Sequence, residues 1–323
     1  MTFAGSPDRV EARLVPEAGF ELDTFRISGL PRRPSIALVR SLVEAGRAPF
    51  ACLRILRHRR PDVVLGGGGY VAGPMVFAAW LSRIPAAVTE ADAHLGLANR
   101  LAAPYARRVF LAYELADRNG AKYRITGRPV PEAHRGVSKA DARARFELPR
   151  EGPVLAFFGA LAGARSLNDF AVGTYGAAGP AVLHLSGERD FERLRPLVTR
   201  ADYRLLPQTP EFGAALAAAD LAVSRAGGTV WELAAAGTPA ILVPYPHATG
   251  DHQTLNARHF EQGGGAIVVP EAELEARVPR LVDELLAAPA RLAEMAAAMR
   301  RLARPRAAEE IADELIALAG GER

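Results

Sequence analysis

A glycine pair followed by a hydroxyl and a carboxylate is the feature of this sequence that points most directly to chemistry. The apolar run Leu221–Val223 leads to Gly227 and Gly228, then to Thr229 and to Glu232 on the first turn of a predicted helix. The free N–H groups and the positive end of a helix at such a junction suit an anion such as a phosphate. A carboxylate one turn into the helix can accept hydrogen bonds from a ribose diol. The pattern predicts a pocket for a nucleotide-linked substrate, although a simple tight turn and dipole complementation by Glu232 would explain the same residues.

A polar cluster follows the next predicted strand, Ala240–Val243. His252, Gln253 and Asn256 come shortly after Pro244. Glutamine and asparagine each carry a donor and an acceptor, which sugar hydroxyls require. Ordinary polar residues at an exposed helix start are the alternative interpretation.

Two further glycine segments follow predicted strands. Gly159-Ala-Leu-Ala-Gly163 comes before Arg165 at a predicted strand-to-helix junction, which suits contact with a phosphate or nucleotide. The run Gly66–Gly69, followed by Tyr70, allows a charged group to approach the backbone closely. A flexible loop would explain the second run equally well.

Length and composition indicate a protein of about two domains. The chain has 323 residues, 49% hydrophobic and 24% charged, which is ordinary for a soluble globular protein. A single cysteine, Cys52, excludes an internal disulfide framework and fits a reducing cytosol. The net charge is +4, but the arginines are scattered and no zinc-finger spacing occurs, so no nucleic-acid partner is predicted. We expect neither a signal peptide nor a membrane-spanning helix, which needs about 20 apolar residues.

Short apolar runs alternate with helical patterns along the chain, which predicts an α/β protein with parallel sheets. The predicted strands are Glu21–Ser28, Asp62–Leu65, Ala86–Thr89, Arg108–Ala112, Tyr123–Thr126, Val154–Phe158, Ala181–Leu185, Tyr203–Leu206, Leu221–Val223, Ala240–Val243 and Ala266–Val269. A proline-rich break near Pro131 predicts domains at 1–131 and 132–305. The helical tail from Val278 to Gly320 is expected to break into two helices at Pro305, and helix 306–320 to return to the first domain.

Taken together, these residues resemble the MurG-type glycosyltransferases of peptidoglycan synthesis over nearly the whole chain. The matching stretches are Glu11–Phe20, Pro61–Pro74, Glu90–Asn99, Gly127–Val130 and Ala222–Asn256, with the opening segment. The resemblance implies a GT-B fold, in which two Rossmann-like domains face each other across a cleft. It also implies transfer of N-acetylglucosamine from UDP-GlcNAc to the muramoyl 4-hydroxyl of lipid I, giving lipid II.

The resemblance assigns the UDP-sugar to the C-terminal half and the lipid acceptor to the N-terminal half. The implied donor contacts are Gly159, Gly163, Arg165, Gly227, Gly228, Thr229, Glu232, His252, Gln253 and Asn256. The implied acceptor contacts are Gly67, Gly68, Gly69, Tyr70 and Asn99, and the implied catalytic residues are Asp92 and Glu90. The chain departs from the family at 160–162, where Ala, Leu and Ala replace residues that include a serine and a glutamine, and at Thr89, Ala91 and Asp92, where the family has His, Gln and Asn.

The implied reaction is a direct displacement at the anomeric carbon, with UDP leaving. Asp92 could act as the general base toward the acceptor hydroxyl, or could instead cap a helix that begins near Ala93. The sequence contains no Asp-x-Asp, and its histidines lack metal-ligand spacing. We therefore predict neither a metal nor another cofactor.

The family's first strand and its Gly-Gly-Thr-Gly-Gly-His loop have no counterpart in the sequence. The chain begins at what would be the second strand, and we expect a truncated gene model rather than a real loss. A chain without this strand and loop is expected to show weak or no transferase activity.

A lipid acceptor implies contact with the cytoplasmic face of the cell membrane, and so a cytoplasmic, peripheral protein. The segment 36–56 is apolar and rimmed by arginines, which suits an anionic bilayer, although a core helix would look similar. Three alternatives remain open from sequence: another lipid glycosyltransferase that uses a UDP-sugar, a UDP-GlcNAc 2-epimerase, and a non-catalytic relative that binds a sugar nucleotide.

Overall fold

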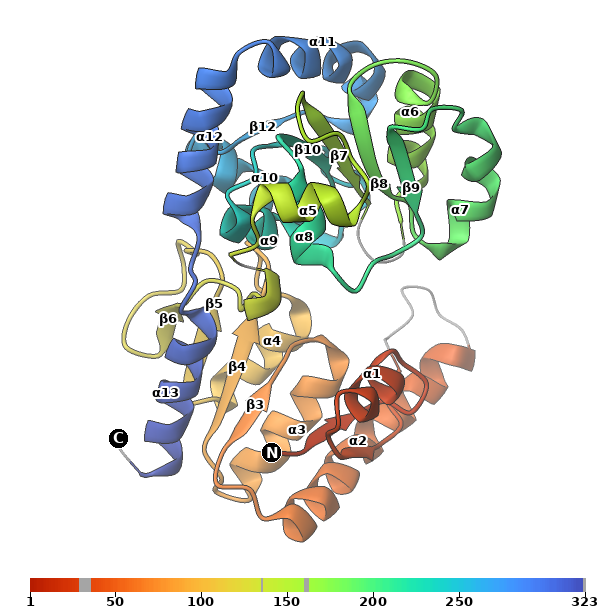
Figure 1. The fold of residues 1–323 in the computed structure, drawn as a ribbon. Helices are drawn as coiled ribbons and strands as arrows, with labels where there is room; N and C mark the ends of the chain where they lie inside the picture. Colours follow the sequence, from red (N-terminus) through yellow and green to blue (C-terminus); the bar gives the residue numbers. More distant parts are fainter. Residues whose placement is uncertain (29–35, 135, 160–162, 322–323) are drawn as a thin grey trace. The chain divides into compact units, whose positions relative to one another are not determined.

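The chain folds into two compact units. The computed structural model describes residues 1–28, 36–134, 136–159 and 163–321 (Figure 1). Unit 1 comprises Met1–Gly127 and Glu309–Arg323, and unit 2 comprises Arg128–Ala308. Both units carry parallel β-sheets flanked by helices, so the predicted α/β class is confirmed.

Unit 2 is built on a six-stranded sheet whose recorded strand pairs are all parallel, in the order β12-β11-β10-β7-β8-β9. The strands are β7 (Val154–Phe158), β8 (Ala181–Leu185), β9 (Tyr203–Leu206), β10 (Leu221–Ser224), β11 (Ala240–Leu242) and β12 (Ala266–Val268). The order reverses between β7 and β10, because the chain first builds outward through β8 and β9 and then returns to the other side of β7. In open α/β sheets, ligands bind beyond the carboxyl ends of the strands at such a reversal.

Helices connect these strands and cover the sheet on both faces (Figure 1). They are η2 (Glu132–His134), α5 (Lys139–Arg145), α6 (Arg165–Tyr175), α7 (Glu188–Leu194), η3 (Arg195–Leu197), α8 (Phe212–Ala218), α9 (Thr229–Ala236), η4 (Thr249–Asp251), α10 (His252–Gln262), η5 (Glu271–Glu273), α11 (Leu274–Leu286) and α12 (Pro289–Leu302). β7, β8 and β10 are buried along their whole length. Burial on both faces explains why they appear in the sequence as continuous apolar runs.

Unit 1 contains a four-stranded parallel sheet, β3-β4-β5-β6, and a separate parallel pair, β1-β2. Its strands are β1 (Phe3–Gly5), β2 (Leu22–Thr24), β3 (Val64–Gly66), β4 (Ala86–Glu90), β5 (Arg108–Leu111) and β6 (Tyr123–Ile125). Its helices are α1 (Glu11–Glu17), α2 (Ile36–Arg59), α3 (Gly69–Leu81), α4 (Leu97–Ala102), η1 (Ala103–Tyr105) and α13 (Ala307–Ala319). The first residues thus form a short strand, β1, which pairs with β2.

The helical tail returns to unit 1 through α13. Ile311 and Leu318 of α13 are buried with Ala87 and Phe110 of the sheet. Glu314 accepts hydrogen bonds from Arg108, at 2.8 Å, and from Arg124, at 3.2 Å. The tail forms three helices rather than the predicted two, because α11 ends at Leu286 and a proline opens α12 three residues later.

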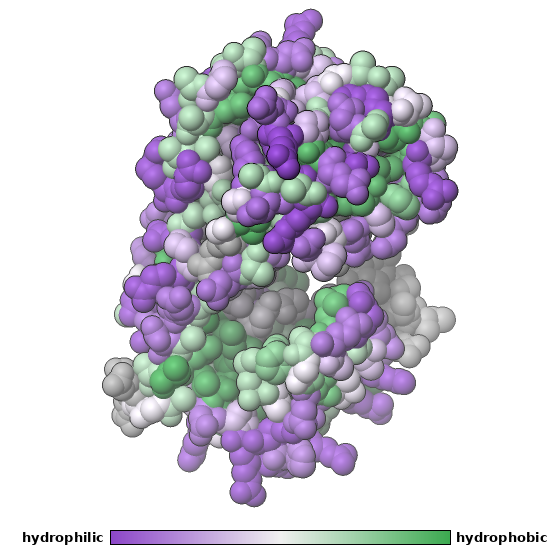
Figure 2. Space-filling model, in the orientation of Figure 1, coloured by the Kyte–Doolittle hydropathy of each residue, from purple (hydrophilic) through white to green (hydrophobic). Residues whose placement is uncertain are grey.

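The described side chains of α2, which forms most of the predicted membrane surface, divide between the core and the exterior. Ala48, Cys52 and Leu56 are buried in the core of unit 1, whereas Val43 and Phe50 are exposed. The core-helix alternative therefore holds for one face of α2. On the side drawn in Figure 2, hydrophobic surface is more continuous on unit 1 than on unit 2.

Candidate functional site

The reversal point of the unit 2 sheet carries both glycine segments of the predicted donor site. β7 ends at Phe158, directly before Gly159, and β10 ends at Ser224, directly before the segment that contains Gly227 and Gly228. Because β7 and β10 are parallel neighbours, their carboxyl ends meet at the same edge of the sheet. The predicted donor residues of these two loops are thus brought together by the topology of the sheet.

Glycine is required at both ends of the first loop. A Cβ at Gly163 would overlap the backbone carbonyl of Ser186, and the residue has a φ of +74°. A Cβ at Gly159 would overlap the backbone N–H group of Ala164. The segment between them, where the sequence departs from the family pattern, lies outside the described residues.

A cavity of about 380 Å³ lies at this edge of the sheet. Its lining residues are His134, Phe158, Gly159, Leu185, Pro207, Gln208, Thr209, Pro210, Phe212, Thr229 and Glu232. The ring centroid of Phe212 lies 5.3 Å from that of Phe158 and 5.6 Å from that of His134, in edge-to-face contacts. One wall is therefore aromatic, and a carboxylate and a hydroxyl stand nearby, which is a suitable environment for a nucleoside.

Glu232 is the acidic group of this cavity. Its side chain is 22% exposed, and Oε1 lies 3.1 Å from Nδ1 of His134. Burial raises the pKa of Glu232, while the neighbouring His134 and Arg128 oppose that rise. His134 and Arg128 thus favour the charged, hydrogen-bond-accepting form of the carboxylate.

Arg128 lies over the start of α9. A Cβ at Gly228 would overlap the Arg128 guanidinium group, so the absence of a side chain at Gly228 makes room for this cation. The guanidinium and the N-terminus of α9 together give this side of the cavity a positive character, which suits a diphosphate.

The polar cluster on α10 makes hydrogen bonds to backbone groups of three different segments. Asn256 is fully buried, and its Nδ2 donates to the carbonyl of Ala226 at 3.1 Å. Gln253 Oε1 accepts from the N–H group of Tyr245 at 2.9 Å, and Nδ1 of His252 lies 2.8 Å from the carbonyl of Thr249. None of the three cluster residues lines the cavity in the described part of the chain.

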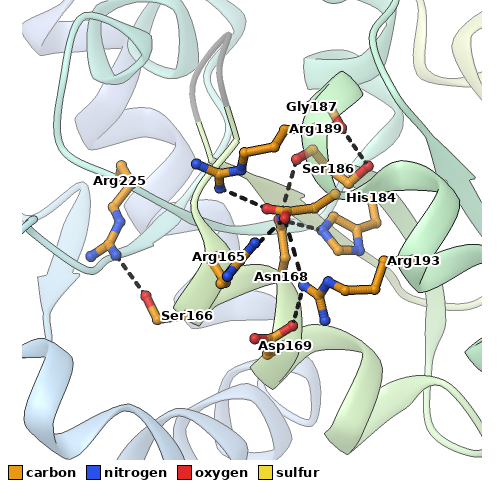
Figure 3. Close-up of polar contacts among 11 residues, drawn as sticks. Arg165, Ser166, Asn168, Asp169, His184, Ser186, Gly187, Arg189, Arg193 and Arg225 are labelled. Carbon is orange, nitrogen blue, oxygen red and sulfur yellow. Dashed lines mark hydrogen bonds and ion pairs between the residues drawn. The ribbon is translucent and has the colours of Figure 1, made fainter.

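Behind the cavity, α6 is tied to the sheet by a buried polar network (Figure 3). Asn168 donates to the Ser186 carbonyl at 2.8 Å and to Asp190 at 3.0 Å, and its Oδ1 lies 2.9 Å from Nε2 of His184. Burial lowers the pKa of His184 to about 3, so the ring is neutral. Since Asn168 uses its amide nitrogen elsewhere, Nε2 of His184 carries the proton and donates to Oδ1.

Arg165, a predicted donor contact, belongs to this network. Its Nε lies 3.5 Å from the buried carboxylate of Asp190, which Arg189 and Arg193 also approach. The hydrogen bond from Arg189 is the main cause of a lowered Asp190 pKa. In the described part of the chain Arg165 does not line the cavity.

In unit 1, the predicted acceptor residues form a second polar site at the ends of β3 and β4. The carboxylate of Glu90 accepts from the N–H groups of Asp92 and Gly96 and from Nδ2 of Asn99, at 3.3, 2.9 and 2.9 Å. Asn99 is buried, and its Oδ1 has no hydrogen-bond partner among the described residues. An unsatisfied buried acceptor of this kind is suited to a ligand or an ordered water.

The glycine run adjoins this site. Gly68 and Gly69 have φ of +91° and +67°, and a Cβ at Gly68 would lie 3.8 Å from Nδ2 of Asn99. Tyr70 follows on the first turn of α3, where the guanidinium of Arg9 lies 5.7 Å from its ring centroid. The run thus has a fixed backbone conformation that only glycine adopts readily.

Asp92 lies in the loop between β4 and α4. The helix begins at Leu97 with Gly96 as its N-cap residue, so Asp92 does not cap a helix at Ala93 and that alternative is wrong. Within the described ranges, no group of His, Cys, Asp and Glu side chains could hold a metal ion, and no helix is long and apolar enough to cross a bilayer.

Comparison with known proteins identifies the family. The glycosyltransferase family 28 C-terminal domain matches residues 154–311, and the family 28 N-terminal domain matches residues 2–111. The chain belongs to glycosyltransferase family 28.

Several curated relatives of the chain carry the name UDP-N-acetylglucosamine--N-acetylmuramyl-(pentapeptide) pyrophosphoryl-undecaprenol N-acetylglucosamine transferase. The Halothermothrix orenii protein is 36% identical over 94% of this chain and 87% of its own length. The Rubrobacter xylanophilus protein is 39% identical over 98% of this chain and 95% of its own length.

Solved structures agree with the family 28 assignment. MurG of Acinetobacter baumannii has a TM-score of 0.76 at 26% identity, covering 98% of this chain and 90% of that chain. A UDP-GlcNAc 2-epimerase from Neisseria meningitidis, bound to UDP-GlcNAc, has a TM-score of 0.62 at 13% identity and covers 98% of both chains, which shows a shared fold alone.

The residues of this candidate site that sequence analysis missed are the aromatic wall and the two basic side chains near Glu232, Arg128 and His134. Arg128 could have been identified from the sequence, because it lies in the Gly127–Val130 stretch that resembles the family. No comparable sequence pattern marks the three aromatic residues of the site, because aromatic side chains at such positions are equally typical of a core. These residues are His134, Phe158 and Phe212.

Replacing Gly228 with alanine tests the position of Arg128. Gly228 has φ −59° and ψ −27°, which any residue adopts, so we expect the variant to fold. The new methyl group displaces the guanidinium, and we expect UDP affinity, measured by calorimetry, to fall by about tenfold. In a double variant with Arg128→Ala, the two losses are expected not to add. Additive losses would show that Gly228 acts independently of Arg128.

Proposed function

We propose that the chain transfers N-acetylglucosamine from UDP-GlcNAc to the undecaprenyl-pyrophosphoryl-muramoyl-pentapeptide lipid I, forming lipid II. The observation that carries the proposal is the unit 2 cavity, which is lined by an aromatic wall and the Glu232 carboxylate, with the Arg128 guanidinium next to it at the start of α9. The names of relatives that are 36% and 39% identical supply the sugar and the acceptor.

Each part of the donor has a counterpart in the cavity. The base packs against Phe158 and Phe212, and the ribose hydroxyls donate to Glu232. The diphosphate lies toward Thr229 and Arg128 at the N-terminus of α9, where the positive helix end stabilises the UDP leaving group. Gln253 remains a candidate for the sugar hydroxyls, because its side-chain amide lies close to the glycine pair. A Cβ at Gly227 would lie 4.0 Å from Nε2 of Gln253.

The acceptor is proposed to bind in unit 1. The backbone of Gly67, Gly68 and Gly69 holds the lipid pyrophosphate, and Tyr70 borders it. Asn99 offers its buried Oδ1 as an acceptor, and Glu90 fixes the loop that carries Asp92. Asp92 is the proposed general base, which removes the proton of the muramoyl 4-hydroxyl as the anomeric C–O bond to UDP breaks.

The transfer itself is the experiment that tests this proposal. Radiolabelled UDP-GlcNAc and a short-chain lipid I analogue are incubated with the protein, and the labelled lipid product and released UDP are measured. We expect product with UDP-GlcNAc and far less with UDP-glucose. UDP binding without any transfer would favour the non-catalytic alternative, and epimerised UDP-sugar would favour the epimerase.

We also propose a membrane-facing surface on α3, α4 and η1 of unit 1. Trp80, Leu97 and Leu101 are 51%, 56% and 63% exposed, and the Trp80 ring centroid lies 5.2 Å from that of Tyr105. Three exposed arginines are close to these residues in the sequence, namely Arg83, Arg100 and Arg107. An aromatic and apolar patch bordered by cations suits an anionic bilayer surface, and so the cytoplasmic face of the cell membrane.

Flotation with phosphatidylglycerol-rich vesicles tests this surface. The double variant Trp80→Gln, Leu101→Gln is expected to lose most of the vesicle-bound fraction, because it removes two of the exposed apolar side chains of the patch. Phe50→Gln is the matched control, since Phe50 is 73% exposed but lies on α2. Loss of vesicle binding in the control alone would show that α2, rather than α3, α4 and η1, carries the membrane-binding surface.

A further inference from the structure

We infer that His134 is a positioning residue of the donor site, whose Nδ1–H group holds Oε1 of Glu232 so that Oε2 receives the ribose hydroxyls. The inference rests on the proposed function, because it assigns the Glu232 carboxylate to the ribose. It adds a residue that no sequence motif indicates, from a segment 98 positions away in the chain.

The contact is direct and largely shielded from water. Nδ1 of His134 lies 3.1 Å from Oε1 of Glu232, and the side chains are only 16% and 22% exposed. In the part of the chain that the structure describes, no other hydrogen bond to this carboxylate is recorded. One carboxylate oxygen is therefore occupied and the other remains for a ligand.

The histidine is itself held in place by three neighbours. Its backbone N–H donates to the carbonyl of Pro131 at 3.0 Å, and its ring packs edge-to-face on Phe212. Gly213 completes the arrangement, because a Cβ there would overlap the backbone of His134. The glycine thus lets η2 approach α8 closely enough for the imidazole to reach Glu232.

Such a fixed donor matters because a glutamate carboxyl rotates easily. The terminal torsion of glutamate is broad, so an unanchored carboxylate would lose rotational freedom when ribose binds. A hydrogen bond already made to Oε1 removes that loss in the free protein and orients the lone pairs of Oε2. His134 is therefore expected to raise the affinity for the diol specifically, rather than for the whole nucleotide.

The competing explanation is that His134 only supports the aromatic wall through Phe212. Two substitutions separate these roles. His134→Asn keeps a donor near the position of Nδ1 and loses the ring, whereas His134→Leu keeps apolar bulk against Phe212 and loses the donor. A positioning role predicts that asparagine preserves function, and a packing role predicts that leucine does.

The experiment measures, by calorimetry, the affinity of wild type and both variants for UDP and for 2′,3′-dideoxy-UDP. We expect the wild type to prefer UDP by at least about tenfold, as the loss of hydrogen bonds to a charged group predicts. His134→Leu is expected to reduce that preference to about threefold or less, and His134→Asn to keep it within about threefold of wild type. Thermal unfolding of each variant establishes that it is folded.

The outcomes distinguish the inference from the proposed function. A wild type that binds both nucleotides equally, or neither, overturns the ribose assignment and the inference with it. If the wild type prefers UDP, but His134→Leu retains that preference or His134→Asn loses it, the positioning role of His134 is overturned. The assignment of Glu232 to the ribose then still holds.

Discussion

Replacing Glu232 with alanine is expected to weaken UDP binding by about 100-fold and to leave the fold intact. In the proposed complex the carboxylate accepts hydrogen bonds from the ribose, and bonds to a charged group contribute about 1.5–3 kcal/mol each. Two such bonds correspond to roughly two powers of ten in affinity. The side chain is 22% exposed, so its removal leaves only His134 to find a new partner, which water can supply.

Calorimetry with UDP measures this loss, and labelled product formation measures its effect on transfer. Glu211→Ala is the matched control: it removes the same charge next to Phe212, but Glu211 is exposed and pairs with Arg145 rather than lining the cavity. We expect wild-type affinity in the control. Wild-type affinity in Glu232→Ala would mean that the nucleotide does not use this carboxylate.

Replacing Asn168 with leucine is expected to destabilise unit 2 by about 3 kcal/mol. The side chain is fully buried, and leucine fills a similar volume but satisfies none of its partners. His184, the Ser186 carbonyl and Asp190 each lose a hydrogen bond, and a buried group without a partner costs about 1–3 kcal/mol. For a unit of this size, such a loss lowers the melting temperature by roughly 6–12 °C.

Calorimetric or dichroism melts measure the effect. The neighbouring Asp169→Asn variant is the control, because Asp169 is 47% exposed and its pair with Arg193 lies at the surface, where ion pairs contribute little. The leucine variant also tests the donor loop, because Asn168 lies next to Gly163 at the end of that loop. A Cβ at Gly163 would lie 3.4 Å from Nδ2 of Asn168. A melting temperature equal to that of the control would show that the network is dispensable.

The strands and their parallel pairing could be predicted because they leave a local signal. Strands such as β7 and β10 are buried on both faces and therefore appear as short apolar runs between helical patterns. The glycines were also informative. Gly163 has a positive φ and no room for a side chain, so glycine is the residue that fits at this position.

The contacts made by polar side chains could not be predicted in the same way. The sequence placed Asn256 toward a sugar, whereas in the structure it is buried against the carbonyl of Ala226. Which side of α10 faces the loop depends on packing from several distant segments. The pairing of His134 with Glu232 depends likewise on how closely η2 approaches α8, which no local pattern encodes.

The return of α13 to unit 1 has a consequence for the order of events during synthesis. Arg108 and Glu314 are separated by 206 positions, and all of unit 2 is made between them. At a synthesis rate of about 5–20 residues per second, roughly 10–40 s pass between the synthesis of the unit 1 sheet and that of the helix that covers Ala87 and Phe110. Unit 2 is one continuous segment and can fold within that interval. The nascent unit 1 therefore exposes apolar surface to chaperones and to other chains for longer than unit 2 does.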